Sequence, residues 1–507
     1  MKIHKPREKQ TLHQFYFYFF AAFLFLIVPN VKATHIVGAD MSYRAVGNNR
    51  YVFILNVYRD CGSTILLENK QTVYYYSINC NIPQDSLVLT GLNDGVGVDI
   101  SPVCSQVRSN CKGGTTPGVE KFTFTDTVTL NTACSDWIFY YKECNRSAGI
   151  LTVVDPQLKC LYIEARLNNL DAPNNSSPTF ENEPVAFVCL NRNVQLNNGT
   201  VESDGDQLKF RLVPPRTNSA LPGQPDNNFL VYKSPYSATS PLPTAGGFNF
   251  DSTSGTMTFN PTLLIRTVTA LKVEEYRNGK LIGSVMRDLQ ILVRSCTNNV
   301  PTLKGVNGST SFEANLCAGV SNQLYFPGSD LDPTDSVTIR WTNPFQGASL
   351  FATKSRRRDS ARFIWTPTIA DTGLVLINLT ITDNSCPTIG SSSASYKLNV
   401  KPSPKVVLRS DTSLNCGVKI PVTAQIVEGR PPFTVKWSGL PDTTRTVLLG
   451  NGNYVVTIED DNGCTDTDDF RILGGSNASA IIKVDSLCVG QLSTIKATVT
   501  GQPTGVT

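Results

Sequence analysis

The stretch VEEYRNGKLIG, residues 273–283, holds two short runs with apolar alternation, separated by Asn278 and Gly279. A two-residue turn between antiparallel strands needs positive φ angles, which Asn and Gly adopt most readily. The stretch therefore predicts a β-hairpin. The same pattern recurs in RAVGNNRYVFIL (44–55) and VLLGNGNYVVTI (447–458).

Strand-like alternation bounded by Gly, Asn, Asp and Pro recurs along the whole chain. Beyond position 33, no stretch keeps the apolar period of an amphipathic helix over three turns. We therefore expect an all-β protein made of tandem β-sandwich modules.

The N-terminal segment 1–33 has the features of a secretory signal peptide. A basic start leads into the apolar run FYFYFFAAFLFLIV at 15–28, and Val31-Lys32-Ala33 offers a small-residue cleavage site. This run is too short to span a bilayer. We expect cleavage before Thr34, with an uncleaved anchor as the alternative, and no transmembrane segment in the mature chain.

Charge and histidine content exclude several functions. The segment 1–33 contains five Lys or Arg and one acid, so the remaining chain carries 40 basic and 40 acidic residues. It has no excess positive field to attract a phosphate backbone, and nucleic acid is not an expected partner. Only His35 remains outside the leader. One histidine beside a chain terminus is a poor basis for metal or acid–base chemistry.

A glycosidase needs two carboxylates and no histidine, so this class survives the composition argument. Glu164, Glu274 and Glu275 are the candidates. Each lies in a strand-like run where an outward-facing acid is ordinary. We expect no enzymatic activity and no catalytic residues.

All 14 cysteines lie beyond position 33, where export to an oxidising compartment favours disulfides. The order of cysteines in the later modules suggests three bridges: Cys189–Cys296, Cys317–Cys386 and Cys416–Cys464. The seven cysteines from Cys61 to Cys160 cannot be paired from sequence. Their odd number leaves one thiol either free or paired with another module.

Internal similarity divides the chain into modules. DGDQLKFRL (204–212) is echoed by DLDPTDSVTIRW (330–341), which suggests two tandem sandwiches. The predicted boundaries are a leader at 1–33, a Cys-rich β domain at 34–175, sandwiches at 176–300 and 301–402, a shorter module at 403–474, and the start of a further module at 475–507. We expect the sequence to be the N-terminal piece of a longer protein.

The module 403–474 has the order Cys416, Trp437, Cys464, which is typical of an immunoglobulin-like sandwich. Asn462 stands where a tyrosine two residues before the second cysteine would be expected. We therefore expect the sandwich architecture without membership of the immunoglobulin family.

Two acidic turns are candidate calcium sites. Asp204 and Asp206 flank a glycine, and Asp330, Asp332 and Asp335 form a second group. A hard cation takes six to eight oxygen ligands, of which such turns supply several. The alternative is a solvated Asx turn that begins a strand. The acids around Cys464 are expected to form a solvated loop, with a metal site as the alternative.

An ordered series of motifs resembles the N-terminal region of gliding-motility-associated and PKD-domain surface proteins of Bacteroidota. The series comprises THIVGADMSY, NVYRDC, CSDWIF, YIEARLNN, APNNSSPTF and VEEYRNGKLIG, between Thr34 and about Asn299. Residues 403–474 resemble gliding-adhesin repeats, and 301–402 are similar to cadherin-like or PKD modules. A single cysteine in ECNRS (143–147) departs from the family pattern, which has a Cys-Cys pair there.

The resemblance implies type IX secretion machinery, an outer-surface location and an adhesive or filamentous protein. We expect a secreted adhesin or structural protein that binds a surface glycan or other cell-surface component. The alternative is a passive stalk that spaces a distal domain. Exposed Trp137 and Tyr74–Tyr76 would favour sugar stacking; we expect them to be buried in the core.

Overall fold

The computed structural model describes residues 36–63, 67–144, 146–147, 149–184, 186–218, 228–341, 346–352, 355–356, 358–410, 419–472, 479–483 and 496–500. In this part the expected all-β fold is confirmed, and the helical segments are short 3-10 turns. Nowhere in it is a helix long and apolar enough to cross a membrane. The predicted leader, His35, Cys416 and Cys488 lie outside the described residues.

The chain forms two compact units, each of which is described by itself. The first lies within residues 1–302, 330–337 and 380–394, and the second within 303–329, 338–379 and 395–507.

Antiparallel strands of the first unit close into a ring. In ring order, the described strands are β1 (Ile36–Ala45), β2 (Arg50–Asp60), β6 (Val119–Thr129), β4 (Ile82–Gly91), β3 (Lys70–Ser77), β7 (Trp137–Cys144), β8 (Cys160–Leu167) and β17 (Lys280–Arg294). The ring closes because β17 pairs with both β8 and β1. Alternation in β2 points Tyr51, Phe53 and Leu55 inward, all fully buried. Phe53 stacks on Phe139 with 4.0 Å between ring centroids.

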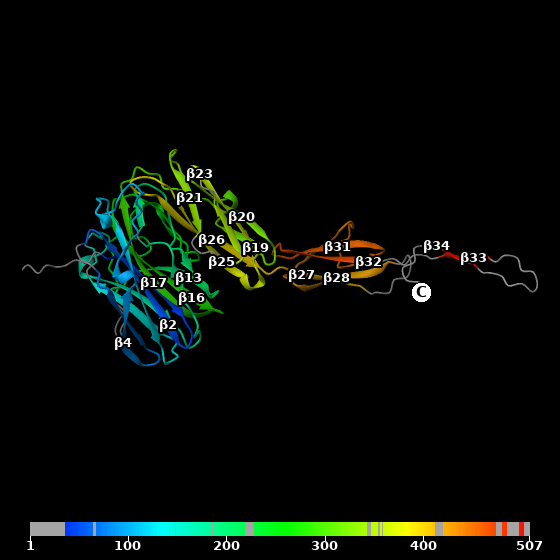
Figure 1. Cartoon of the computed structure of the whole chain (residues 1–507), viewed down its shortest axis with the longest axis horizontal. Coiled ribbons are helices and arrows are strands. Elements are labelled where there is room, and N and C mark those ends of the chain that lie inside the picture. Colours follow the sequence, from blue (N-terminus) through cyan, green and yellow to red (C-terminus); the bar gives the residue numbers. More distant parts are fainter. Residues whose placement is uncertain are drawn as a thin grey trace, which may run out of the picture. The chain divides into compact units, whose positions relative to one another are not determined.

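β17 joins the two modules that the sequence separates. Along one edge it pairs with β16 (Arg266–Arg277), forming the expected hairpin, in which Asn278 and Gly279 have φ angles of 52° and 77°. Its other edge meets β8, β1 and the parallel strand β10 (Ala186–Cys189) in succession. Figure 1 shows β17 beside β16. The predicted boundary between 34–175 and 176–300 is therefore wrong, because a strand of 15 residues offers more edge than one partner can pair.

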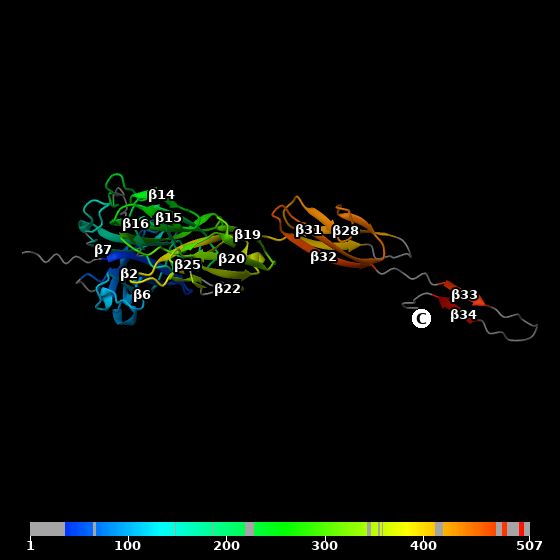
Figure 2. The same cartoon turned by 90° about the horizontal axis from the view of Figure 1, so that it is seen from above.

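A second layer covers part of this sheet. β11 (Val194–Leu196), β15 (Met257–Pro261) and β14 (Thr244–Phe250) form a separate sheet, while β13 (Gln207–Val213) extends the large sheet beside β16. Figure 2 shows β14 and β15 next to β16. Met257 and Phe259 from one layer and Ile291 from the other share one apolar cluster. β9 (Thr179–Phe180) and β12 (Thr200–Val201) form a small pair nearby in sequence.

Residues 302–401 supply two further sheets. One contains β18 (Thr302–Leu303), β20 (Asn322–Ser329), β24 (Arg358–Trp365) and β22 (Ala348–Ala352), in that order. The other contains β19 (Glu313–Cys317), β26 (Ser391–Lys401), β25 (Gly373–Thr382), β21 (Ser336–Trp341) and β23 (Ser355–Arg356). In the second unit, Phe326 lies 4.4 Å from Tyr396 and 5.9 Å from Phe363 between centroids, and all three are fully buried.

Residues 405–472 form two three-stranded sheets (Figure 2). They are β27 (Lys405–Ser410), β28 (Ile420–Glu428) and β30 (Thr446–Leu449), and β29 (Thr434–Trp437), β31 (Gly452–Glu459) and β32 (Thr465–Ile472). Trp437 is buried in their shared core, as an immunoglobulin-like sandwich requires. Further along, β33 (Ser479–Lys483) pairs with β34 (Lys496–Thr500).

Six disulfides cross-link the described residues. They are Cys61–Cys111, Cys80–Cys134, Cys104–Cys386, Cys144–Cys160, Cys189–Cys296 and Cys317–Cys464. The expected Cys189–Cys296 bridge is present. Cys104 is the odd cysteine of the N-terminal region, and it pairs outside that region.

The predicted Cys317–Cys386 and Cys416–Cys464 bridges are wrong. Cys317 ends β19 opposite Lys401, directly before β27, so it faces the following module and bonds to Cys464. Cys386 lies in the loop after β25, where a β-bridge joins Val103 to Thr388 and brings Cys104 within bonding distance.

Candidate functional site

The acidic turn after β20 meets a carboxylate that the sequence analysis did not select. Asp330, Asp335 and Asp383 each offer one oxygen, and these oxygens all lie within 4.8 Å of one another. Asp330 and Asp335 come from the loop between β20 and β21, whereas Asp383 directly follows β25. Two strand ends that are far apart in sequence therefore build one cluster in the first unit.

The hydrogen bonds of this cluster leave several oxygens unpaired. Asp383 accepts hydrogen bonds from the backbone N–H groups of Ser385 (3.0 Å) and Gly390 (2.8 Å), and from Asn298 Nδ2 (2.8 Å). Asp330 Oδ1 accepts one from a backbone N–H, but its Oδ2 has no hydrogen-bond partner among the described residues. Asp335 Oδ2 and Asn298 Oδ1 are likewise buried without a hydrogen-bond partner.

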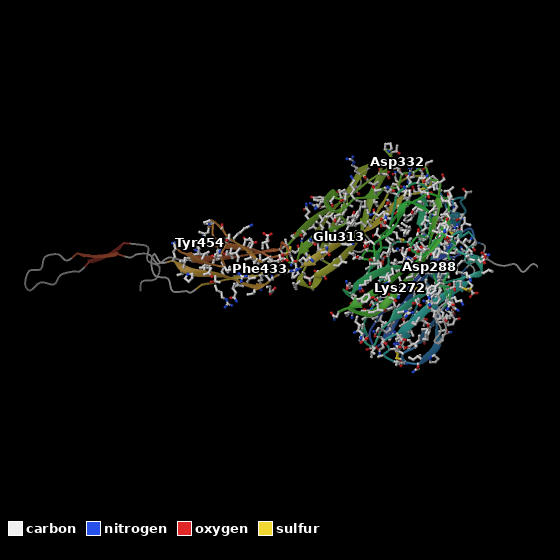
Figure 3. All side chains as sticks on the ribbon, turned by 180° about the vertical axis from the view of Figure 1, so that it is seen from behind. Lys272, Asp288, Glu313, Asp332, Phe433 and Tyr454 are labelled. Atoms are coloured by element: carbon white, nitrogen blue, oxygen red, sulfur yellow. A yellow bond between two sulfur atoms is a disulfide. The ribbon has the colours of Figure 1, made fainter. Side chains whose placement is uncertain are left out.

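Asp332, which was also predicted to be a calcium ligand, has a different role. Its carboxylate accepts hydrogen bonds from the backbone N–H and the side-chain Nδ2 of Asn299, at 2.7 and 2.6 Å. It thereby fixes the segment that follows β17 to the loop between β20 and β21. Figure 3 labels Asp332 in this loop.

The surroundings of the cluster disfavour the ionised form of its carboxyl groups. Burial is the main cause that raises the pKa of Asp330 to about 6, and the neighbouring carboxylates add to the effect. Burial also raises the pKa of Asp383, against the lowering effect of its hydrogen bonds. The cluster thus concentrates negative charge in a partly desolvated place.

The first predicted calcium site has its own cation. Arg277 binds Asp206 through two hydrogen bonds of 2.7 Å and lies 3.7 Å from Asp204. Glu202 accepts the backbone N–H groups of Asp204 and Asp206, and Gly205 has a φ of 82°. This geometry is that of a hydrogen-bonded turn, and the guanidinium supplies the positive charge that a metal ion would otherwise bring.

The three candidate glycosidase acids are buried rather than presented to a substrate. Glu275 is fully buried, accepts a hydrogen bond from Asn175 Nδ2 at 3.2 Å, and leaves Oε1 unpaired. Burial, with help from neighbouring acids, raises its pKa well above the usual range. Glu164 pairs with Arg166 at 2.8 Å and Glu274 with Arg211 at 3.0 Å. Each therefore has a structural partner.

The aromatic residues considered for sugar stacking belong to the core. Trp137 is 3% exposed and Tyr76 6%, while Tyr74 and Tyr75 are half-buried. Trp137 Nε1 donates to Asn169 Oδ1 at 3.1 Å. Tyr74 stacks on Tyr140, and Tyr75 on Phe139.

The acids near Cys464 are structural as well. Asp466 and Asp468 accept hydrogen bonds of 2.8 Å from the backbone N–H groups of Val406 and Leu408. Carboxylates of β32 thus accept hydrogen bonds from backbone N–H groups of β27. Sequence reasoning took this group for a solvated loop, since a role in pairing with another strand leaves no local signal.

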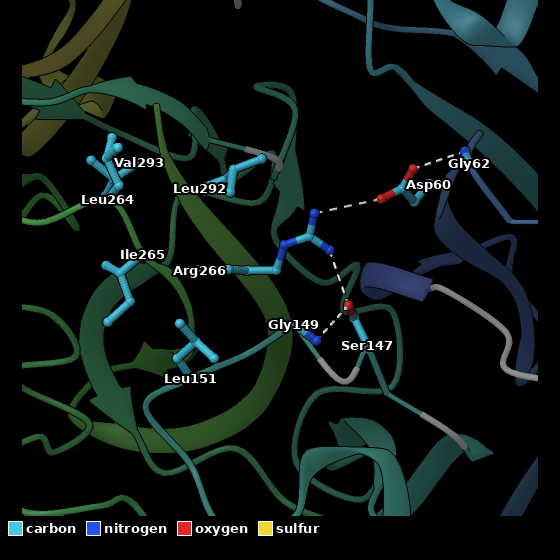
Figure 4. Close-up of a pocket in the computed structure, with 10 residues that line it drawn as sticks. All are labelled: Asp60, Gly62, Ser147, Gly149, Leu151, Leu264, Ile265, Arg266, Leu292 and Val293. Atoms are coloured by element: carbon cyan, nitrogen blue, oxygen red, sulfur yellow. Dashed lines mark hydrogen bonds and ion pairs between the residues drawn. The ribbon is translucent and has the colours of Figure 1, made fainter. Parts of the chain in front are cut away.

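An open hollow of about 600 Å³ lies on the first unit, lined by both polar and apolar side chains (Figure 4). Arg266 reaches into it, 3.6 Å from Asp60 and 3.0 Å from Ser147 Oγ. Leu151 and Leu264 are exposed beside it. Arg266 and Asp60 are paired with each other, so neither of these two charges is free to take part in catalysis.

No protein-family model matches the chain, and no curated protein matches its sequence. Solved structures with detectable similarity include extracellular domains 3–5 of Drosophila OTK, at 12% identity and a TM-score of 0.20, covering 59% of this chain and 97% of that one. A titin I-band fragment has 13% identity and a TM-score of 0.19, with 58% and 96% covered.

The eight N-terminal Ig domains of the Down syndrome cell adhesion molecule have 10% identity and a TM-score of 0.22. The match covers 85% of this chain and 48% of that one. All three are tandem immunoglobulin-domain proteins, and such low TM-scores describe no shared overall arrangement. The class of this protein, tandem disulfide-linked β-sandwiches, is defined by its own strands and bridges.

Proposed function

We propose that the protein is a secreted cell-surface protein with an adhesive or structural role, of the kind associated with gliding motility. The observation that supports this most is the set of six disulfides, which form and persist in oxidising, extracellular compartments. The surroundings of the three candidate acids favour a non-enzymatic role, since each is buried or ion-paired.

A passive stalk is the second candidate, and the position of the aromatic residues favours it. Trp137 and Tyr76 are buried, so they supply no exposed stacking platform for a sugar. The expected partners under the first proposal are a surface glycan or another cell-surface component, together with the secretion machinery that exports the chain.

Competition on the cell surface separates the two candidates. Cells that produce the protein are allowed to attach to a glycan-coated surface in the presence of added purified secreted protein. An adhesin should reduce attachment in a dose-dependent way, whereas a stalk should leave it unchanged. Protein found inside the cell with its thiols reduced would contradict both candidates.

A further inference from the structure

We propose that Asp330, Asp335, Asp383 and the side-chain oxygen of Asn298 bind one calcium ion. The proposal goes beyond the adhesive or structural role and does not depend on it. Three carboxylates gather here in the first unit, and none of them forms an ion pair with a described basic side chain.

The unpaired oxygens point to a ligand. Asp330 is 4% exposed, yet its Oδ2 has no hydrogen-bond partner in the described part of the chain, and buried polar atoms without partners are rare in native proteins. Asn298 donates its Nδ2 to Asp383, which places its unpaired Oδ1 beside the same carboxylate. A cation would satisfy these oxygens together, because all of them are acceptors.

A second acidic cluster in the same chain differs from this one because a basic side chain neutralises it. In the Glu202, Asp204 and Asp206 cluster, whose carboxylate oxygens also lie within 4.8 Å of one another, the Arg277 guanidinium donates a hydrogen bond to each oxygen of Asp206. Among the described residues, the Asp330 cluster has no such guanidinium. A bound cation would neutralise the cluster at neutral pH with its carboxylates ionised.

Size and chemistry favour calcium over other ions. Carboxylate and amide oxygens are hard ligands, and the cluster includes neither histidine nor a free thiol that would suit zinc. Calcium–oxygen distances of about 2.3–2.6 Å place ligands on opposite sides of the ion up to about 5 Å apart. The three carboxylate oxygens lie within 4.8 Å of one another, so one calcium ion can contact all of them. Magnesium requires about 2.0–2.1 Å and near-octahedral ligands, which three irregular segments supply poorly.

The ion would fasten three segments of the first unit. Asn298 follows β17, Asp330 and Asp335 belong to the loop before β21, and Asp383 begins the loop that the Cys104–Cys386 bridge anchors. Calcium and the disulfide would therefore hold the same loop from two sides.

The test uses the purified secreted protein, freed of metal with a chelator and then titrated with calcium chloride by calorimetry. We expect one site with a dissociation constant of about 0.1–1 mM, as in extracellular modules. We also expect the melting temperature to rise with calcium. No heat of binding and no shift at about 10 mM calcium, well above that range, would overturn the proposal.

Two variants locate the site. Asp330→Asn and Asp335→Asn should each weaken calcium binding at least tenfold. Asp330→Asn should also melt at the same or a higher temperature than the wild type without metal, because it removes charge repulsion, and this result shows that the variant is folded. Asp383 is not used, since its hydrogen bonds to Ser385 and Gly390 also hold the loop.

The matched control is Asp206→Asn, which alters the cluster that Arg277 neutralises. It should leave calcium affinity within twofold. Calcium binding that is lost in Asp206→Asn but kept in Asp330→Asn and Asp335→Asn would overturn the assignment. Magnesium binding as tight as calcium would overturn the choice of ion.

Discussion

Several buried charges of the first unit are matched in ion pairs, whereas buried Glu275 forms none with a residue that the structure describes. Arg287 and Asp40 are fully or nearly fully buried and lie 2.7 Å apart, and Arg146 bonds to Asp288, which Figure 3 labels, at 2.5 Å. Such pairs offset the cost of burying each charge. Glu275 lacks this compensation: it accepts a hydrogen bond from an amide, and its Oε1 has no hydrogen-bond partner within the described ranges.

We predict that Glu275→Gln stabilises the protein at neutral pH. The pKa of Glu275 is raised above the ordinary value of 4.5 in the folded state, so its stabilising protonation is complete below that value and is lost as pH rises through the folded pKa. The variant should raise the melting temperature at pH 7 by more than at pH 4. Thermal melts across this range provide the measurement, and an equal effect at both values would contradict it.

At the scale of elements, β1 and β17 pair where their backbones approach each other closely. A Cβ added at Gly38 would lie 2.7 Å from the carbonyl oxygen of Asp288, which belongs to the backbone and cannot rotate away. Gly38 pairs with Leu289 at the point where the ring closes. A side chain there would force the two strands apart.

Gly38→Ala should therefore lower the free energy of unfolding by about 1–3 kcal/mol, the usual cost of overpacking. The control is Gly149→Ala, where the nearest atom is Ser147 Oγ at 3.4 Å, an ordinary contact. We expect it to change stability by no more than about 0.5 kcal/mol. Urea denaturation of both variants gives the comparison; equal losses would show that ring closure is not sensitive to this contact.

Local patterns predicted the elements well but not their long-range partners. Asn278 and Gly279 identify the β16–β17 hairpin, because a turn of positive φ has a short sequence signature. The pairing of β17 with β1 joins strands from opposite ends of the first unit's main segment, and nothing local specifies it. The same limit applies to the acidic cluster: the turn with Asp330 and Asp335 was visible, whereas Asp383 and Asn298 come from other strand ends.

At the scale of the whole molecule, the disulfides that join residues far apart in sequence restrict the unfolded chain most. Cys104 and Cys386 are 282 residues apart, whereas Cys144 and Cys160 are 16 apart. On the chain-entropy account, closing the longer loop destabilises the unfolded state by about 5.6 kcal/mol and closing the shorter loop by about 3 kcal/mol.

We predict that the double variant Cys104→Ser with Cys386→Ser lowers the melting temperature more than Cys144→Ser with Cys160→Ser. The reason is the larger gain in freedom of the unfolded chain. Thermal melts under non-reducing conditions measure the effect, and mass spectrometry of non-reduced peptides checks the pairing. A peptide linking Cys317 to Cys386 would refute the bridge pattern described above.

Three of the overlapping bridges form a continuous series along the sequence, which determines how the protein would respond to tension. Cys61–Cys111 encloses Cys104, and Cys104–Cys386 encloses Cys317, which is bonded to Cys464. A force pulling residues 61 and 464 apart would thus pass from sulfur to sulfur, and the shortest covalent route uses only residues 104–111 and 317–386. Each extended residue on this route adds about 3.4 Å of length. The other residues between 61 and 464 add none while the bridges are intact. Oxidised, the protein could lengthen between residues 61 and 464 only by unfolding the residues on this route; reduced, the whole stretch between them could be drawn out to several times that length.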